Sequence, residues 1–239
     1  MKSLESETDR FMREHYTGYY HQTKGHVPPE AKKSLVSRMA MDITSLDSSA
    51  CVLDLGSGRQ MTERFLNIQG IKPSCRIVTL DLAGLLPNQL LERKNEKITH
   101  LRGDGSRLPF RDSTFHIVFS DMAVELMPDR ALSELARVLK PNGRAYINVL
   151  NPFVPEIQRE KTAERLTQDA HIRSARSNRS DKQWLEYWNR YLSGSSLFVS
   201  ENAPSVQKLQ KEGLSLARFQ EIQGKETRWI EIDLVKKAA

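Results

Sequence analysis

Length, composition and charge limit the class of protein. The chain has 239 residues, of which 38% are hydrophobic and 28% charged, a balance typical of a globular protein and not of a disordered one. No run approaches the roughly 18 apolar residues that a membrane-spanning helix needs, and the first ten residues lack the apolar core of a secretory signal, so we expect neither a membrane span nor secretion. The net charge of +6 is spread along the chain, which favours ordinary surface charge over a nucleic-acid-binding patch.

The cysteine and histidine usage predicts neither a disulfide framework nor a metal site. Cys51 and Cys75, the only cysteines, lie beside apolar runs, so a reducing cytoplasm is the default expectation. The six histidines show no ligand spacing on one helix face.

The first 49 residues are polar and read as helical pieces. Pro28-Pro29 is a plausible helix start, and apolar residues then recur at helical spacing between positions 35 and 43. From Ala50 the pattern changes to short apolar runs that alternate with helical segments. The runs predict strands at residues 51–55, 76–81, 98–101, 115–120 and 144–150. Helices are predicted at 61–68 and at 130–140, where Pro141-Asn142-Gly143 ends the second one.

Such alternation predicts a mostly parallel sheet with helices on both faces and with the strand carboxyl ends at one edge, where ligands bind in open α/β folds. The end of the chain differs. Residues 206–213 read as a helix, and the β runs 216–222 and 228–235 are joined by a short turn at residues 224–227, too short for a parallel connection. We therefore expect seven strands, the last of them antiparallel. Residues 151–202 have a different composition and are predicted to be an insertion between the fifth and sixth strands.

The informative motif is a buried strand that runs into a glycine turn, Asp54-Leu55-Gly56-Ser57-Gly58, with a helix after it. Glycine permits positive φ angles and lets a ligand approach the backbone, and the helix start offers free N–H groups. Asp81, at the end of the next strand, can accept both hydroxyls of a ribose. A nicotinamide-dinucleotide fingerprint would need glycine at position 61, where the chain has Met61, so that hypothesis fails.

Together with later motifs, this unit resembles the class I S-adenosylmethionine-dependent methyltransferases. The later motifs are Gly103-Asp104-Gly105, Leu108-Pro109-Phe110 and Leu139-Lys140-Pro141-Asn142-Gly143. The last two are similar to those of the small-molecule methyltransferase subgroup. The resemblance covers residues 50–150 and implies a Rossmann-like fold with S-adenosyl-L-methionine as cofactor.

The resemblance also implies roles for individual residues. Those bordering the methionine part would be Asp54, Gly56, Ser57 and Gly58. Asp81 would hold the ribose, with Leu82 packing on the adenine. Asp104 would bind the adenine amino group beside Gly105, and Ser120 would lie near the methyl group. Two departures stand out: Gln60 occupies the position of a frequent third glycine, and His116 replaces a usual acidic residue, more as a structural substitution than as a catalytic base.

The expected acceptor is a small organic molecule. The alternatives are an RNA or protein methyltransferase, or a non-catalytic S-adenosylmethionine-binding or scaffold protein. No catalytic residue is assigned, and the methylated atom and the oligomeric state are left open.

Two segments outside the motifs are candidates for the acceptor pocket. Residues 1–49 are predicted to be an N-terminal helical lid in which Tyr20 or His21 contacts substrate, with packing on the domain surface as the alternative. Within a methyltransferase domain of residues 50–239, the 151–202 insertion is predicted to be a substrate-side cap. The spacing of Trp184, Tyr187 and Trp188 puts them on one helical face there. That face would either form a wall for the substrate or pack onto the main domain.

Overall fold

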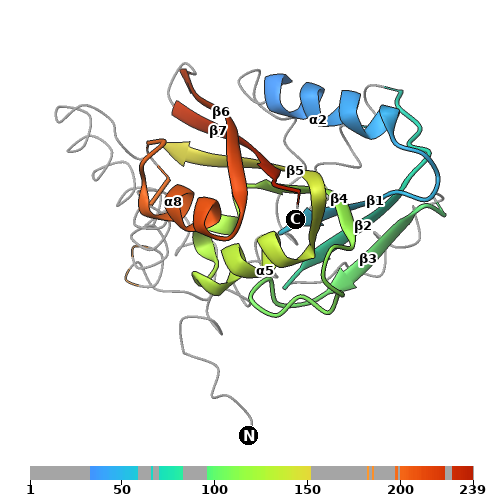
Figure 1. The fold of residues 1–239 in the computed structure, drawn as a ribbon, viewed down its shortest axis with the longest axis horizontal. Coiled ribbons are helices and arrows are strands. Elements are labelled where there is room, and N and C mark those ends of the chain that lie inside the picture. The colour runs from blue at the N-terminus through green and yellow to red at the C-terminus, as the bar shows by residue number, and fades with distance from the viewer. Residues whose placement is uncertain are drawn as a thin grey trace, which may run out of the picture.

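Seven strands form a single sheet in the computed structural model (Figure 1). The structure describes residues 33–58, 66, 70–82, 96–151, 182, 185, 197–198, 200–223 and 228–238. The strands are β1 (Cys51–Leu55), β2 (Arg76–Asp81), β3 (Ile98–Arg102), β4 (Phe115–Asp121), β5 (Leu139–Asn151), β6 (Leu214–Gln223) and β7 (Arg228–Lys236). Their order is β3-β2-β1-β4-β5-β7-β6. Strand β7 runs antiparallel to the other six strands, so the predicted mostly parallel sheet with an antiparallel last strand is confirmed.

Helices cover both faces of this sheet, as predicted. Helix α2 (Lys33–Ser45) lies on one face, and α5 (Arg130–Val138) and α8 (Pro204–Lys211) lie on the other (Figure 1). Each central strand is buried on both sides, because alternate residues enter two separate apolar cores. In β1, for example, Leu53 belongs to the core under α5 and α8, whereas Val52 belongs to the core under α2.

Element boundaries differ most at the start of β5. The predicted helix 130–140 ends at Val138, and the strand expected from residue 144 begins at Leu139. The proline–glycine turn is a bulge inside the strand: Leu139 lies opposite Phe115, and the register then jumps to Arg144 opposite Ile117. The sequence reads this turn as a helix stop because it does not show that the next strand has already started.

Helix α2 is part of the main core. Its apolar residues Leu35, Met39, Ala40 and Ile43 are buried against the sheet. The helix begins at the carboxyl edge of the sheet, where the Leu35 N–H donates to Glu231 Oε1 at 3.1 Å. It ends near the start of β5, where Asp42 accepts from Arg144 at 2.9 Å. Residues 1–32 lie outside the described residues, so their role as a lid stays a prediction.

None of the helices in the described ranges is long and apolar enough to cross a bilayer.

Candidate active site

The glycine turn after β1 is held against the end of β2. The N–H groups of Gly56 and Ser57 donate to the Leu80 carbonyl at 2.8 and 3.2 Å, and the Gly58 N–H donates to Asp81 Oδ2 at 2.8 Å. Gly56 and Gly58 have φ angles of 72° and 48°, which L-residues with a side chain rarely adopt. The glycines therefore let the turn fold back so that a backbone N–H orients the Asp81 carboxylate.

Another segment of the protein lies directly against the backbone of Gly56. A Cβ at Gly56 would lie 2.2 Å from the Cβ of Ala123, and one at Gly105 would lie 2.6 Å from Met127 Sδ. Both neighbours flank η2 (Val124–Leu126), the short helix after β4. Close approach of a ligand is the expected reason for Gly56, but at both Gly56 and Gly105 the approaching group is the segment after β4. The glycines thus bring the ends of β1, β3 and β4 together.

Hydrogen bonds also join the turn after β3 to this group. The Gly103 N–H donates to the Asp81 carbonyl at 3.0 Å. Ser106 orients Asp104, because its N–H donates to Oδ1 and its hydroxyl to Oδ2, both at 2.8 Å. Asp104 is exposed, and each of its carboxylate oxygens keeps a further lone pair for a ligand N–H. Sequence reasoning missed Ser106, although an aspartate followed two residues later by serine is a known turn pattern.

The remaining predicted cofactor residues lie at the same edge. Asp54, Ser57 and Ser120 are buried, with exposed fractions of 2%, 6% and 0%. Leu82 follows β2, and its carbonyl accepts from Arg102 Nε at 3.0 Å. The structure therefore brings together the strand ends that carry all the predicted cofactor residues.

The carboxylates at this edge suit an S-adenosyl ligand with a positively charged sulfur. Carboxylates suit ribose hydroxyls and an adenine amino group, which donate hydrogen bonds. A further carboxylate, on the buried Glu125, follows in η2. This negative charge complements a ligand with a cationic sulfur and an ammonium group.

An ion pair on α5 supports the loop between the adenine-side turn and β4. Arg137 donates to the carbonyls of Leu108 and Phe110 at 3.1 and 2.8 Å, and Glu134 Oε2 accepts the Leu108 N–H at 2.8 Å. The hydrogen bonds from Arg137 hold the pKa of Glu134 below its usual range. Sequence reasoning missed this pair; its three-residue spacing on a helix was the available signal.

His116 lies at the opposite edge of the sheet and has structural contacts there. Its Nδ1 accepts the Cys51 N–H at 3.2 Å, where β1 begins. Burial lowers the pKa of His116, and the nearby Lys140 ammonium lowers it further. These contacts support the interpretation of His116 as a structural substitution.

The predicted substrate residues lie outside the described residues: Tyr20, His21, Trp184, Tyr187 and Trp188. Gln60 lies outside them as well. Within the described part of the chain, no group of three or more His, Cys, Asp or Glu side chains could hold a metal ion.

Comparisons with known proteins agree with this fold. Residues 53–147 match the family model described as a methyltransferase domain. A malonyl-[acyl-carrier protein] O-methyltransferase of Marinomonas sp. is 27% identical over 201 residues, which cover 77% of this chain and 70% of the relative. The ubiquinone/menaquinone biosynthesis C-methyltransferase UbiE of Hahella chejuensis is 31% identical over 121 residues, covering 47% of this chain and 48% of the relative.

The match to a third relative is shorter. The biotin biosynthesis bifunctional protein BioHC of Cellvibrio japonicus is 32% identical over 103 residues, and the chain spans only 20% of its length. Among solved structures, the 1,6-didemethyltoxoflavin-N1-methyltransferase of Burkholderia thailandensis, crystallised with S-adenosylhomocysteine, has a TM-score of 0.64 at 14% identity, covering 100% of this chain and 92% of that one. With the strand order and the motifs at the carboxyl edge, these matches identify residues 53–147 as a methyltransferase domain of the class I, S-adenosylmethionine-dependent type.

Proposed function

We propose that this protein transfers a methyl group from S-adenosylmethionine to a small organic molecule. The observation that carries the proposal is the double use of Asp81: its side chain accepts the Gly58 N–H and its backbone carbonyl accepts the Gly103 N–H. Asp81 thereby joins three strand-end turns into one surface that matches a nucleoside. The small-molecule acceptor is supported by relatives whose names describe quinone and malonyl-group methylation.

The protein's contribution to such a reaction is positioning. When bound, the cofactor supplies an electrophilic methyl group on a sulfonium. Asp81, fixed by the Gly58 N–H, would hold the ribose, and Asp104, fixed by Ser106, would hold the adenine. The acceptor must then be held in line with the methyl group, and such alignment supplies much of the rate enhancement.

Two features support a lid and a cap over this edge. Helix α2 begins, and strand β5 ends, at the carboxyl edge of the sheet, next to the end of β4. The segments that precede Lys33 and follow Asn151 therefore attach where an acceptor would bind. We propose contacts to the acceptor from Tyr20 or His21 in the first segment and from Trp184, Tyr187 and Trp188 in the second.

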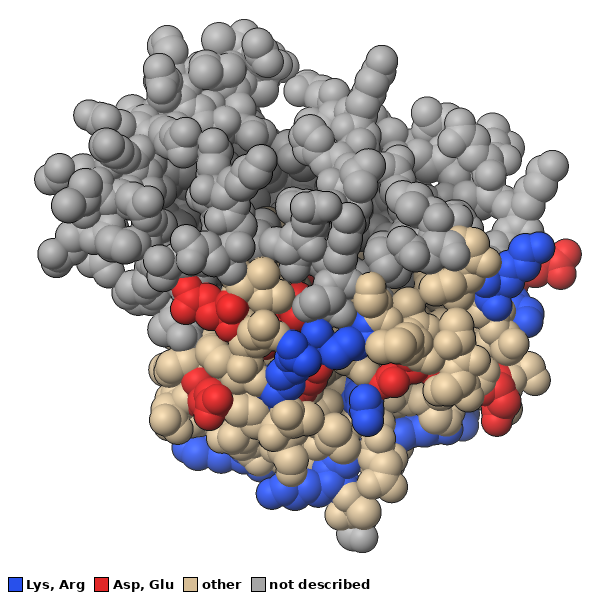
Figure 2. Space-filling view, turned by 90° about the horizontal axis from the view of Figure 1, so that it is seen from above, with Lys and Arg blue, Asp and Glu red and all other residues tan. Residues whose placement is uncertain are grey.

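The charge distribution gives less support to an RNA substrate. On the face seen in Figure 2, acidic and basic side chains of the described residues are interspersed and form no continuous basic surface. Nucleic-acid sites depend on such a surface to neutralise phosphates. We also infer a cytoplasmic location, which the free, buried thiols of Cys51 and Cys75 support: they belong to cores on opposite faces of the sheet and so do not pair.

The test has two parts. Calorimetry with S-adenosylhomocysteine measures cofactor binding. We expect Asp81→Asn to weaken it, whereas Asp129→Asn, at a 75% exposed side chain before α5, does not. Transfer of a labelled methyl group to a cell extract, separated into metabolites, RNA and protein, identifies the acceptor class. Label in the RNA or protein fraction would replace the small-molecule proposal, and binding without transfer to any fraction would indicate a non-catalytic protein.

A further inference from the structure

A row of polar side chains crosses the end of the sheet on the α2 face. Asp121 of β4, Asn148 of β5 and Glu231 of β7 lie opposite one another in register. Asn148 and Glu231 are buried, with exposed fractions of 1% and 0%, and Asp121 is half-buried. Since β4 lies next to β1, this row begins one strand away from Asp54 and the glycine turn.

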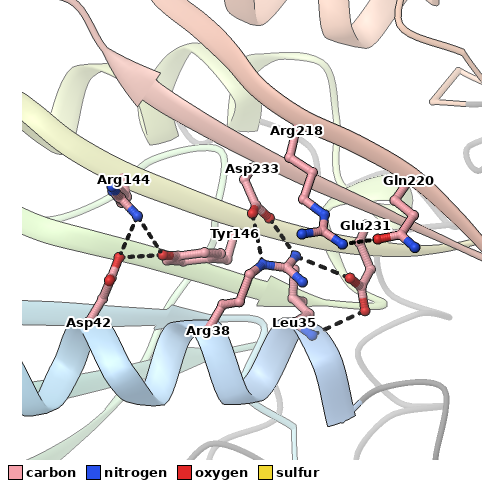
Figure 3. Close-up of polar contacts among 9 residues, drawn as sticks. All are labelled: Leu35, Arg38, Asp42, Arg144, Tyr146, Arg218, Gln220, Glu231 and Asp233. Atoms are coloured by element: carbon pink, nitrogen blue, oxygen red, sulfur yellow. Dashed lines mark hydrogen bonds and ion pairs between the residues drawn. The ribbon is translucent and has the colours of Figure 1, made fainter.

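Both carboxylate oxygens of Glu231 accept hydrogen bonds from α2. One of its oxygens accepts the Leu35 N–H, and the other pairs with the Arg38 guanidinium, both at 3.1 Å (Figure 3). Arg38 also pairs with Asp233, so its single positive charge is shared between two carboxylates. This end of the row therefore has a structural role.

In the described part of the chain, one polar side-chain atom of Asn148 has a hydrogen-bond partner and the other has none. Its Nδ2 donates to Asp121 Oδ1 at 2.7 Å. Its Oδ1 is buried and has no hydrogen-bond partner within the part of the chain that the structure describes. Buried amide oxygens in native proteins almost always accept a hydrogen bond, so a donor is expected at this position.

We propose that Asp121 and Asn148 form the methyl-acceptor subsite and that it takes a primary amine or an exocyclic amino group. The inference rests on the proposed function. Both side chains offer oxygens that accept hydrogen bonds, and a nitrogen with two N–H groups can donate to both and still keep its lone pair for the methyl carbon. A hydroxyl can donate to only one of them, and a carboxylate acceptor would be repelled by Asp121.

The chemistry of this subsite balances without a further reagent. The nitrogen lone pair forms a bond to the methyl carbon while the carbon–sulfur bond breaks, and that electron pair returns to sulfur as a neutral thioether. The nitrogen is then cationic, and one of its protons passes to the Asp121 carboxylate and on to water. Asp121 is thus the catalytic residue, and Asn148 positions it.

The identity of the methylated atom tests the substrate class. The full chain is incubated with S-adenosylmethionine carrying ¹³C in its methyl group and with a metabolite extract, and the product methyl is assigned by its ¹³C chemical shift. We expect a methyl on nitrogen that survives mild base. A methyl ester cleaved by base, or a methyl on hydroxyl oxygen, carbon or sulfur, would overturn the subsite while leaving methyl transfer established.

Variants test the two residues. We expect Asp121→Asn, which keeps an oxygen for the Asn148 amide, to lower kcat about 100-fold, as loss of a proton acceptor does, with the Kd of S-adenosylhomocysteine within about twofold of wild type. Asn148→Ala should raise KM for the amine more than it lowers kcat. Asp129→Asn, the same change at a 75% exposed side chain, is the matched control.

Wild-type turnover in Asp121→Asn, or loss of S-adenosylhomocysteine binding in that variant, would contradict the assignment. Failure of the wild-type chain to bind S-adenosylhomocysteine or to transfer any label would instead contradict the proposed function.

Discussion

The two faces of the sheet bury different kinds of side chain. Under α5 and α8 the contacts are apolar, with Leu132, Leu135, Val206 and Leu209 packed on the strands. Under α2 the apolar core is smaller, and polar contacts accompany it: Arg38 with Glu231 and Asp233, and Asp42 with Arg144 and the Tyr146 hydroxyl (Figure 3).

Four of the five buried polar residues on the described strands follow the same division, and Ser120, on the α5–α8 face, is the exception. Asp54, Thr79, Asn148 and Glu231 are all buried, and each alternates along its strand with residues of the α5–α8 core. Apolar burial contributes most to stability, whereas buried ion pairs contribute little net stability. We infer that the α5–α8 face contributes most to holding the fold together, whereas the α2 face, towards the carboxyl edge, carries most of the buried polar groups of the strands.

The largest expected effect is on the α5–α8 face. Leu135→Ala removes a fully buried side chain and leaves a cavity, so the free energy of unfolding should fall by about 2–5 kcal/mol, measured by urea denaturation. S-adenosylhomocysteine affinity of the folded variant should be unchanged. Met41→Ala, at a 64% exposed site on α2, is the control, with an expected change within about 0.5 kcal/mol. Equal losses in the two variants would show that Leu135 contributes no more to stability than an exposed side chain.

Glu231→Ala probes the polar face. It leaves the Leu35 N–H without its acceptor and Arg38 with one carboxylate in place of two, and we expect a loss of about 3 kcal/mol in the free energy of unfolding. The matched change Asp233→Ala should cost less, because Asp233 is more exposed and Leu35 keeps its partner. A larger loss in Asp233→Ala would show that α2 is held mainly by the outer pair.

Arg137→Met tests whether α5, on the apolar face, supports the loop next to the site. The variant loses the bonds that hold the loop 108–112 on α5, next to the turn that carries Asp104. We expect the Kd of S-adenosylhomocysteine to rise about tenfold, equivalent to about 1.4 kcal/mol. Calorimetry with Arg130→Met, an exposed position on the same helix, provides the control. Unchanged affinity in Arg137→Met would show that the loop does not position the adenine side.

The sequence was sufficient for the features that depend on local patterns. Strands β1 and β2 begin and end where the apolar runs do, and Asp81 is placed correctly because parallel strands end at one edge. The sequence was not sufficient to predict contacts between distant segments of the chain. Nothing local to Gly56 reveals that Ala123, which follows β4, approaches it, and nothing local to Asn148 reveals that it meets Asp121. Such contacts depend on strand order and register, which only the fold determines.

The smallest expected effect concerns His116, at the edge opposite the site. Its Nδ1 accepts the Cys51 N–H, and its Nε2 lies 3.2 Å from Lys140 Nζ. Burial and Lys140 lower the pKa of His116 in the folded state, while Asp47 opposes the shift. Folding therefore favours the neutral ring, and the resulting stabilisation is complete above the unfolded pKa of about 6.5 and is lost as the pH falls through the folded pKa.

Urea denaturation between pH 5 and 8 measures this contribution, and we expect the free energy of unfolding to fall as the pH is lowered over this range. His116→Asn keeps an oxygen that can accept the Cys51 N–H but does not titrate, so its stability should depend less on pH over this range. Methyl transfer should be unaffected at pH 8, because the residue lies at the edge away from the cofactor. An equal loss of stability in both proteins would assign the pH dependence to another group, and loss of transfer activity in His116→Asn would restore His116 as a candidate for the chemistry.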